Sequence, residues 1–282
     1  MTTVGVIGLG DIGRGVAEAV ARAGLPLVVC DLRAEVTAPF AARAHVAGSP
    51  SELGARADVV VVAVVNDHQV LAVLDGEEGA LAGAAPGSVV VILSTVSPGT
   101  VEVAAGLAAR RDVDVVDCGV SGGPQASAEG TLVAMVGGEA AVIERVRPVL
   151  RAFTSLVVHM GPLGAGLKAK LARNLVQYGS WLAAYEAQVL AEAAGIELAK
   201  LAEVIRESDK LIGGASRLMF RDTVAPLPPD SHPAIVDAMG AGAALAHKDL
   251  KAALELARTL HIELPLAQMT DDRCDDVFGL GS

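Results

Sequence analysis

The chain has 282 residues, of which 52 % are apolar and seven are aromatic, and its formal net charge is −11 at pH 7. This length allows one large or two medium domains, and the negative charge argues against nucleic acid or an anionic membrane as a partner. The three cysteines, Cys30, Cys118 and Cys274, do not have the spacing of metal ligands, so we expect no metal site. The sequence shows neither a leader pattern nor a membrane-spanning run, and the odd number of cysteines suits a reducing compartment, so we expect a cytoplasmic protein.

Short β-branched runs alternate with alanine-rich stretches through residues 1–160. The expected strands are Thr3–Gly8, Pro26–Asp31, Asp58–Val65, Ser88–Ser94, Asp114–Cys118, Leu132–Val136 and Leu156–Met160. Near-continuous Val and Ile indicates strands buried on both faces, as in a parallel sheet. Helical stretches such as Arg14–Arg22 and Glu139–Arg151 lie between them, and the sequence therefore predicts a doubly wound α/β fold.

The alternation stops at Gly161-Pro162-Leu163-Gly164. Beyond this point the pattern is helical, with helices expected over Leu167–Ala194, Glu197–Arg206 and about 243–260. We therefore predict a nucleotide-binding domain over residues 1–163 and an all-helical domain over residues 164–282.

The first strand leads into a glycine-rich turn, Gly8-Leu9-Gly10-Asp11-Ile12-Gly13. A strand, a G-x-G-x-x-G turn and a helix follow in the order that a dinucleotide-binding site requires. Asp31 ends the second strand, 18 residues after Gly13 (31 − 13 = 18). A carboxylate at this position accepts hydrogen bonds from the adenine ribose and repels a 2′-phosphate, which favours NAD. Arg33 could instead favour NADP.

Two further segments follow strands where ligands bind in open α/β sheets, beyond the carboxyl ends. One is Ser94–Pro98 and the other is Ser121-Gly122-Gly123-Pro124. Ser121 offers a hydroxyl, and the two glycines offer approachable N–H groups, a combination suited to a carboxylate although common in ordinary loops.

Lys170 and Asn174 lie four residues apart, on one face of the helix that follows Gly164. An amine that can lose its proton, next to a neutral amide, suits removal of a proton from a hydroxyl group. Lys168 lies about 200° around the same helix and cannot serve the same site.

Tyr178, Trp181 and Tyr185 continue the Lys170 face at helical spacing. We expect this face to enter a pocket or an interface, with packing in the core favoured for Trp181 and Tyr185. The charged segment His247–Lys251 would, taken alone, be a solvated helical turn.

Taken in order, these segments resemble the β-hydroxyacid dehydrogenase family, typified by 3-hydroxyisobutyrate dehydrogenase and related to 6-phosphogluconate dehydrogenase. The motifs that carry the resemblance are Gly8–Gly13, Val64-Val65-Asn66, Ser94–Pro98, Asp117–Gly123, Glu129–Leu132, Gly164–Asn174 and Lys248-Asp249-Leu250. The family's fold is a Rossmann domain, a long connecting helix and a helical domain that helps to form a homodimer or homotetramer.

The resemblance also implies roles for individual residues. Lys170 would be the catalytic lysine, with Asn174 orienting the substrate. The substrate would be held by Ser121, Gly122 and Gly123, and the cofactor would also be reached by Val64, Val65, Thr95 and Lys248. The implied activity is hydride transfer between NAD (NADP being possible) and a small 3-hydroxy acid or its aldehyde or keto form.

Departures from the family pattern leave the substrate open. Gly119 stands where the family usually has proline, which we expect to loosen the loop before Ser121, and Arg173 stands where it usually has asparagine. The acidic stretch after Pro265 has no assigned place. The alternatives are an imine reductase, which usually carries Asp or Tyr in place of Lys170, and a nucleotide-binding protein without activity.

Overall fold

The computed structural model describes residues 1–214 and 225–281. The chain divides into two compact units, Met1–Arg173 and Asn174–Ser282, called here the N-terminal and C-terminal units. This division falls inside helix α9 (Ala165–Ala193), so it lies later in the chain than the predicted boundary after residue 163. The predicted domain boundary stays a prediction.

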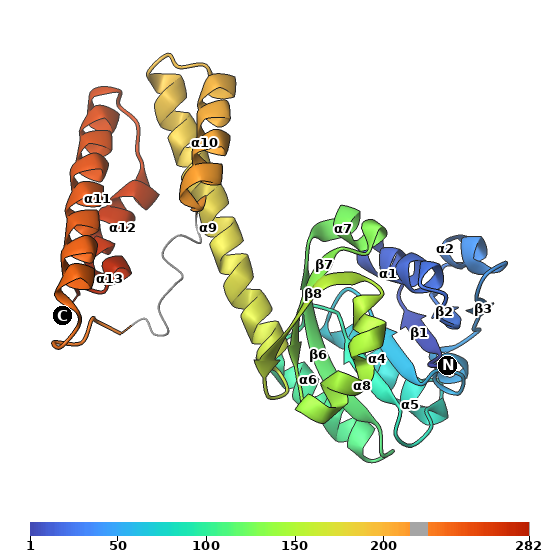
Figure 1. Ribbon diagram of the computed structural model, residues 1–282. Helices are drawn as coiled ribbons and strands as arrows, with labels where there is room; N and C mark the ends of the chain where they lie inside the picture. Colours follow the sequence, from blue (N-terminus) through green and yellow to red (C-terminus); the bar gives the residue numbers. More distant parts are fainter. Residues whose placement is uncertain (215–224, 282) are drawn as a thin grey trace. The chain divides into compact units, whose positions relative to one another are not determined.

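An eight-stranded sheet in the order β3-β2-β1-β4-β5-β6-β7-β8 forms the centre of the N-terminal unit (Figure 1). Its strands are β1 (Val4–Ile7), β2 (Leu27–Cys30), β3 (His45–Val46), β4 (Val59–Val62), β5 (Val89–Ile92), β6 (Asp114–Ser121), β7 (Leu132–Gly137) and β8 (Thr154–Gly161). All neighbouring pairs are parallel except β6 and β7, which are antiparallel. The predicted doubly wound fold is confirmed, with one reversal.

The helices of this unit are α1 (Asp11–Arg22), α2 (Ala34–Thr37), the 3₁₀ turn η1 (Ala38–Phe40), α3 (Pro50–Gly54), α4 (Asp67–Leu74), α5 (Ala80–Gly83), α6 (Pro98–Ala109), α7 (Gly123–Glu129) and α8 (Ala140–Arg151). Ser49, Asn66 and Ser97 cap α3, α4 and α6 by accepting a backbone N–H. Gly10 precedes α1 without a capping side chain, which leaves the N–H groups of that helix available.

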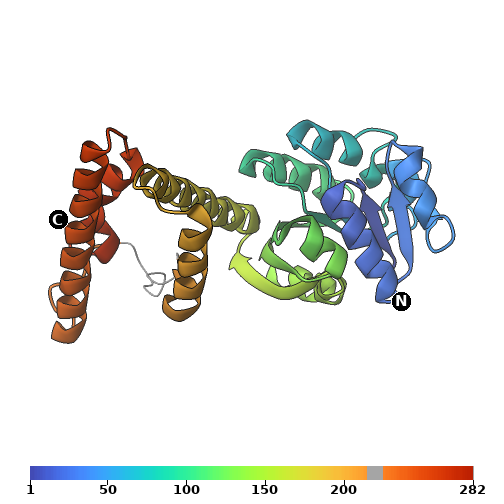
Figure 2. The same cartoon turned by 90° about the horizontal axis from the view of Figure 1, so that it is seen from above.

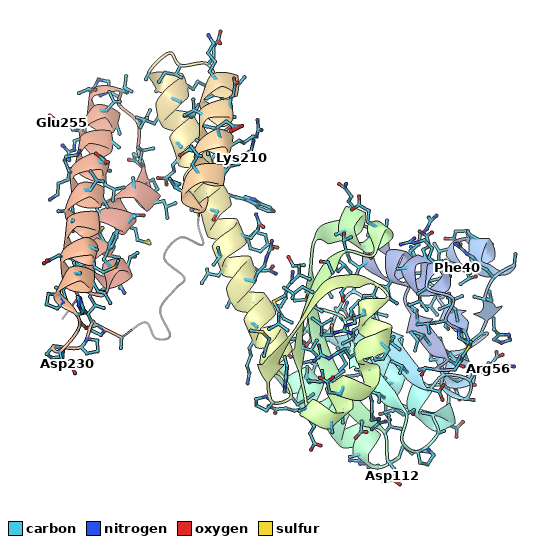
Figure 3. The ribbon with its side chains drawn as sticks, viewed as in Figure 1. Phe40, Arg56, Asp112, Lys210, Asp230 and Glu255 are labelled. Carbon is cyan, nitrogen blue, oxygen red and sulfur yellow. The ribbon has the colours of Figure 1, made fainter. Side chains whose placement is uncertain are left out.

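Strands β1, β2, β4 and β5 are buried on both faces, because successive side chains alternate between two cores, whereas β3 and most of β8 are exposed. Val59 and Val61 of β4 join the core under α1 and α8, whereas Val60 and Val62 join the core under α3, α4 and α6. Leu167, in the first turns of α9, belongs to the second core. Phe40, which is labelled in Figure 3, is a fully buried member of the first core.

Several elements differ from the expected ranges. The two-residue strand β3 was not predicted, because a strand so short has no periodic signal. Strand β6 continues to Ser121 instead of ending at Cys118. Helix α1 begins at Asp11, directly after the second glycine of the motif, so part of the motif is helical.

The C-terminal unit is helical, as predicted. It contains the rest of α9, followed by α10 (Leu198–Ile212), α11 (Pro233–Thr259), α12 (Pro265–Asp272) and α13 (Cys274–Phe278). Lys210 on α10 and Glu255 on α11 are exposed (Figure 3). Helix α11 begins earlier than expected because Pro233 occupies its first turn, where a missing N–H costs nothing. None of the helices in the described ranges is long and apolar enough to cross a membrane.

A buried carboxylate joins α9 to α12 within this unit. Glu186, 7 % exposed, accepts hydrogen bonds from the N–H groups of Leu266 (2.7 Å) and Ala267 (3.1 Å). These N–H groups begin α12, whose N-cap residue, Leu264, has no side chain that can cap. Glu186 therefore replaces the missing cap from a distant part of the chain.

The acidic C-terminal stretch has a place in the structure. His247 on α11 lies between Asp271 (Nδ1 to Oδ1, 2.6 Å) and Asp275 (Nε2 to Oδ1, 3.3 Å). The hydrogen bond to Asp271 outweighs desolvation and, with Asp275, raises the pKa of His247 above its ordinary 6.5. The three side chains clamp α12 and α13 against α11.

We expect the clamp to weaken as pH rises. Because the folded pKa of His247 is raised, its stabilisation is complete below pH 6.5 and is lost as pH passes through the folded pKa. Between pH 6 and pH 8.5, the free energy of unfolding measured with urea should fall more in the wild type than in His247→Gln. An NMR titration midpoint for His247 at or below 6.5 would contradict this expectation.

Candidate active site

The glycine motif forms the tight turn that a dinucleotide requires. Gly8 has a φ of +88°, which only glycine adopts without strain, and a Cβ on Gly13 would overlap the carbonyl oxygen of Gly8. A Cβ on Gly10 would meet no atom within 4 Å, so the turn is open above this residue. With the uncapped start of α1 beside it, this turn fits a pyrophosphate group.

Asp31 follows β2 and contacts the glycine turn directly. Its carboxylate accepts the N–H of Leu9 (2.7 Å) and pairs with the Arg33 guanidinium (Nε to Oδ1, 3.1 Å). Burial alone would raise the pKa of Asp31, but the hydrogen bonds from Arg33 and Leu9 outweigh it and lower the pKa. Asp31 is therefore a fixed anion at the position where the sequence predicts ribose binding, and Arg33 is held against it.

The predicted cofactor residues Val64, Val65 and Thr95 follow the neighbouring strands β4 and β5. The Val64 N–H donates to the Ser94 hydroxyl (2.9 Å), which joins the two strand ends. Val65 and Thr95 are exposed at this edge. Because β1, β4 and β5 are parallel neighbours, these residues lie at the carboxyl ends of the strands, as the glycine turn does.

Asp67 fixes the loops that follow these two strands, a role that the sequence did not reveal. Its carboxylate accepts hydrogen bonds from the Ser97 hydroxyl (2.7 Å) and the Thr100 hydroxyl (2.5 Å). Those bonds, with a further one from the Ser97 N–H, lower the pKa of Asp67 to about 2. The starts of α4 and α6 are thereby joined.

Ser121 ends β6, and Gly122 and Gly123 turn the chain into α7. Gly122 has a φ of +130° and Gly123 a φ of +72°, so this turn depends on glycine. A Cβ on Gly122 would lie 2.5 Å from the Cβ of Ala126, inside α7. A larger residue at Gly122 would therefore strain the turn itself rather than fill the space above it.

A buried carboxylate holds the start of α9 against β6. Asp117 is fully buried, and its two oxygens accept the N–H groups of Gly164 and Leu167, each at 2.6 Å. Both donors belong to the beginning of α9, where N–H groups lack helical partners and the helix dipole favours an anion. Sequence reasoning gave Asp117 no role, although a charged residue inside a valine-rich strand was a usable signal.

Lys170 packs on the same strand through Gly119. A Cβ on Gly119 would lie 2.5 Å from the Cβ and 3.2 Å from the Cγ of Lys170, so the lysine stem occupies the space that a side chain would take. Gly119 is a strand residue paired with Met135, and the expectation that it loosens a loop is wrong. Successive residues of a strand face opposite sides of the sheet. Asp117, Gly119 and Ser121 are two residues apart in β6, so all three face the same side. Lys170 therefore lies against the face that carries Ser121.

The environment of Lys170 favours its neutral amine. Burial first, and then the charge of Arg173, lower the pKa of the Lys170 ammonium. Arg173 lies three residues further along α9, on nearly the same side of the helix. A lysine with a lowered pKa in a ligand-binding region has the property that a general base needs.

The remaining predicted residues belong to the C-terminal unit. Asn174 follows Lys170 by about one turn of α9, and Lys248 is an exposed residue of α11 whose ammonium lies 3.2 Å from Asp249. Their proposed roles stay predictions. The preference for a packed core at Trp181 and Tyr185 is wrong, because these side chains are 60 % and 62 % exposed.

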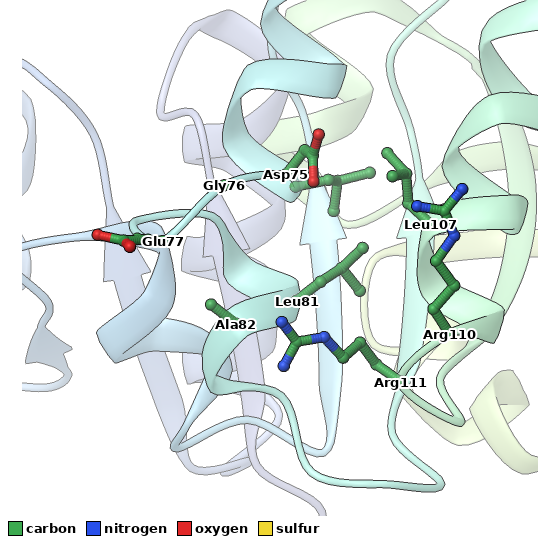
Figure 4. A pocket seen from close by; sticks show the side chains of 9 residues that line it. Asp75, Gly76, Glu77, Leu81, Ala82, Leu107, Arg110 and Arg111 are labelled. Atoms are coloured by element: carbon green, nitrogen blue, oxygen red, sulfur yellow. The ribbon is translucent and has the colours of Figure 1, made fainter.

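A separate cleft of about 480 Å³ lies elsewhere on the N-terminal unit (Figure 4). It is formed by the end of α4, by α5 and by the end of α6, with Arg110 and Arg111 on one side. These helix ends lie at the amino ends of the strands, and no predicted site residue lines the cleft. Among residues 1–214 and 225–281, no cluster of three or more His, Cys, Asp or Glu side chains could hold a metal ion.

Fold and site together define an NAD(P)-dependent oxidoreductase. Two family models match the chain: the NAD-binding domain of 6-phosphogluconate dehydrogenase over residues 3–161, and the NAD-binding domain of NADP-dependent 3-hydroxyisobutyrate dehydrogenase over residues 164–276. The chain belongs to the β-hydroxyacid dehydrogenase family, whose members act on CH–OH groups with NAD or NADP.

Relatives with assigned activities support this membership. The chain is 40 % identical to L-threonate dehydrogenase of Cupriavidus necator (73 % of this chain, 70 % of that one). It is 32 % identical to 2-(hydroxymethyl)glutarate dehydrogenase of Eubacterium barkeri (94 % and 86 %). A putative oxidoreductase of Mycobacterium avium 104 has a solved structure with 36 % identity, full coverage of both chains and a TM-score of 0.92.

Imine reductases share the fold. The enzyme of Myxococcus stipitatus, solved with NAD⁺, has a TM-score of 0.79 over all of this chain and 95 % of its own, at 20 % identity. At that identity the likeness concerns the fold alone.

We expect Asp117→Ala to lower the free energy of unfolding by about 3 kcal/mol, because two buried N–H groups lose their acceptor. It should also reduce kcat roughly tenfold by releasing the first turn of α9 beneath Lys170. Urea unfolding and steady-state kinetics measure the two effects. The matched control is Asp114→Ala in the same strand, where the pair with Arg145 is partly exposed and its loss should matter little. Equal effects of the two substitutions would contradict the assignment.

Proposed function

We propose that this protein oxidises a small 3-hydroxy acid, or reduces the corresponding aldehyde or keto form, with Lys170 as the general acid/base. The observation that carries the proposal is the packing of Lys170 on Gly119, against the strand that ends at Ser121. The lowered pKa of this amine, caused by burial and by Arg173, supports a role in proton transfer.

In the proposed reaction each residue acts through its own chemistry. Ser121 and the N–H groups of Gly122 and Gly123 bind the substrate carboxylate and orient its hydroxyl, and Asn174 completes the alignment. The neutral Lys170 amine takes the hydroxyl proton. The bound nicotinamide supplies the hydride acceptor. In reduction, Lys170 returns the proton to the new alkoxide oxygen.

The proposed cofactor residues are those of the glycine turn and the adjoining strand ends. They are Gly8, Leu9, Gly10, Asp11, Ile12, Gly13, Asp31, Val64, Val65, Thr95 and Lys248. The open turn above Gly10 and the fixed Asp31 carboxylate support this set.

The substrate class extends to acids with a further polar group. The named relatives act on L-threonate and on 2-(hydroxymethyl)glutarate, and the second of these carries two carboxylates. Arg173 places a permanent cation on the helix face beside Lys170, where the family usually has a neutral residue. Dicarboxylic and polyhydroxy acids therefore belong in the substrate screen.

We further propose a homodimer or homotetramer in which residues 164–282 are the substrate and oligomerisation domain. Tyr178, Trp181 and Tyr185 leave an exposed aromatic face on α9, and such faces are typical of interfaces. The free, buried cysteines support a cytoplasmic location, and the charge of −11 supports the absence of nucleic-acid and anionic-membrane partners.

The decisive experiment is a cofactor-reduction screen over 3-hydroxy acids, with Lys170→Ala as the test variant. Loss of a general base should lower kcat by about 10²- to 10⁴-fold while the dissociation constant of the cofactor stays the same. Lys168→Ala is the matched control, because Lys168 is exposed on another side of α9. Full activity in Lys170→Ala, or preferential turnover of imines, would overturn the proposal.

We expect kcat for oxidation to fall as pH drops below the pKa of Lys170, because only the neutral amine accepts a proton. Arg173→Asn removes a repelling cation, so it should raise the pKa of Lys170 and move this acid limb to higher pH. The kcat–pH profiles of both proteins test this expectation. An unchanged profile in the variant would mean that Arg173 does not act on the base.

We expect a higher kcat/KM with NAD than with NADP, because the Asp31 carboxylate would face the 2′-phosphate and Arg33 is already paired with it. Asp31→Asn should reduce the preference. If the wild type instead prefers NADP, and Arg33→Ala abolishes that preference, then Arg33 binds the 2′-phosphate.

A further inference from the structure

Helices α1 and α7 lie side by side and begin at the two ligand-binding loops (Figures 1 and 2). Helix α1 starts within the glycine turn, and α7 starts directly after Ser121 and Gly122. The contact between these helices therefore sets the spacing of the two loops.

A buried hydroxyl links the helices near both loops. Ser127 of α7 is fully buried, and its Oγ donates a 2.7 Å hydrogen bond to the carbonyl oxygen of Ile12. Ile12 belongs to the G-x-G-x-x-G turn itself. The bond therefore runs from α7 to the first turn of α1, at the helical end of the glycine motif.

Close packing fixes the geometry of this bond. A Cβ on Gly15 of α1 would lie 2.5 Å from the Ser127 Oγ and 2.6 Å from its carbonyl carbon. A glycine at this position is thus required for the two helices to approach so closely. At the far end of the contact, Arg22 Nη2 donates to the carbonyl oxygen of Ala128 at 2.7 Å. The helices are joined at two points along their length.

Ser127 stands between two alanines inside α7, so its hydroxyl is the one polar side-chain group in that part of the helix. A serine inside a helix usually bonds back to its own preceding turn. Ser127 instead donates across to α1, and burying its hydroxyl without that partner would be costly.

We propose that Ser127 is a positioning residue that makes the glycine turn and the Ser121–Gly123 loop one rigid body, so that dinucleotide and substrate carboxylate bind cooperatively. The proposal rests on the proposed function, which assigns the carboxylate to the second loop. Each loop contains at least one glycine with positive φ, namely Gly8 in the first loop and Gly122 and Gly123 in the second, and glycine restricts the backbone less than any other residue does. With the bond in place, the first ligand orders both loops, and the second binds to a loop that is already ordered.

The test is a double titration of the whole protein. The dissociation constant of NADH is measured by its fluorescence, with and without saturating isobutyrate, a carboxylate that has no hydroxyl to oxidise. We expect isobutyrate to tighten NADH about fivefold or more in the wild type. The coupling is measured by the ratio of the NADH dissociation constant without isobutyrate to the one with isobutyrate. In Ser127→Ala this ratio should fall to at most half of the wild-type value. An unchanged ratio would overturn the proposal.

Two further variants separate coupling from general stability. Ser88→Ala removes another buried serine hydroxyl that donates to a backbone carbonyl, that of Ala85 at 2.7 Å, and Ser88 directly precedes β5, at the amino ends of the strands and away from both loops. It should lower the melting temperature but keep the ratio. Gly15→Ala keeps Ser127 but pushes the helices apart, and it should lower the ratio as much as Ser127→Ala does. A ratio lowered equally in Ser88→Ala would mean that Ser127 acts only on stability.

The result also distinguishes this proposal from the proposed function. If isobutyrate binds to the wild type, and Ser121→Ala weakens that binding, then an equal ratio in the wild type and in Ser127→Ala overturns the coupling alone. If isobutyrate does not bind to the wild type at all, the coupling proposal is overturned, whereas the proposed function is decided by the cofactor-reduction screen and the Lys170→Ala variant.

Discussion

The hydrogen bonds between the buried Asp117 carboxylate and the first N–H groups of α9 are the interaction on which the candidate site depends. An anion inside a valine-rich strand is costly unless it is satisfied, and a helix start offers both donors and a favourable dipole. Once this contact is made, the first turn of α9 has one place on β6. Lys170 then meets Gly119, where the absent side chain leaves room for its stem. Lys170, the proposed general base, is thus held by the interior of the fold and not by a surface loop.

The C-terminal unit uses the same device. Glu186 is buried and binds the first N–H groups of α12, as Asp117 does for α9. In both cases the helix lacks a capping side chain of its own, and a carboxylate from a distant segment supplies the acceptor. Such a carboxylate fixes tertiary position as well as the helix start, because its bonds form only when the two segments meet. This explains why charged residues occur where a reading of hydrophobicity alone would expect valine or leucine.

Much of this arrangement could be predicted from the sequence. The valine runs gave the strands, the glycine spacing gave the first turn of the nucleotide site, and the spacing of Lys170 and Asn174 gave a shared helix face. The hydrogen-bond partners of Asp117, Asp67 and Ser127 could not be predicted, because each partner lies at least 30 residues away in the chain. Gly119 was assigned to a loop because glycine ordinarily ends a strand, whereas here it admits another side chain. Exposure of Trp181 was missed because helical periodicity identifies an apolar face without identifying what covers it.

The antiparallel pairing of β6 with β7 has a topological consequence. Because β7 runs back from Ser121 and β8 runs parallel to β7, the chain leaves the sheet at Gly161, level with Gly137 and therefore with Asp117. The next helix must then run in the same direction as β6, toward its carboxyl end. In an ordinary β-α-β unit, a helix that follows a parallel strand runs back toward the amino ends and carries its side chains away from the ligands. Because one strand pair is reversed, the helix after β8 runs along β6 toward Ser121 instead of returning to the amino ends of the parallel strands. Lys170 therefore approaches the strand ends at which we propose that the ligands bind.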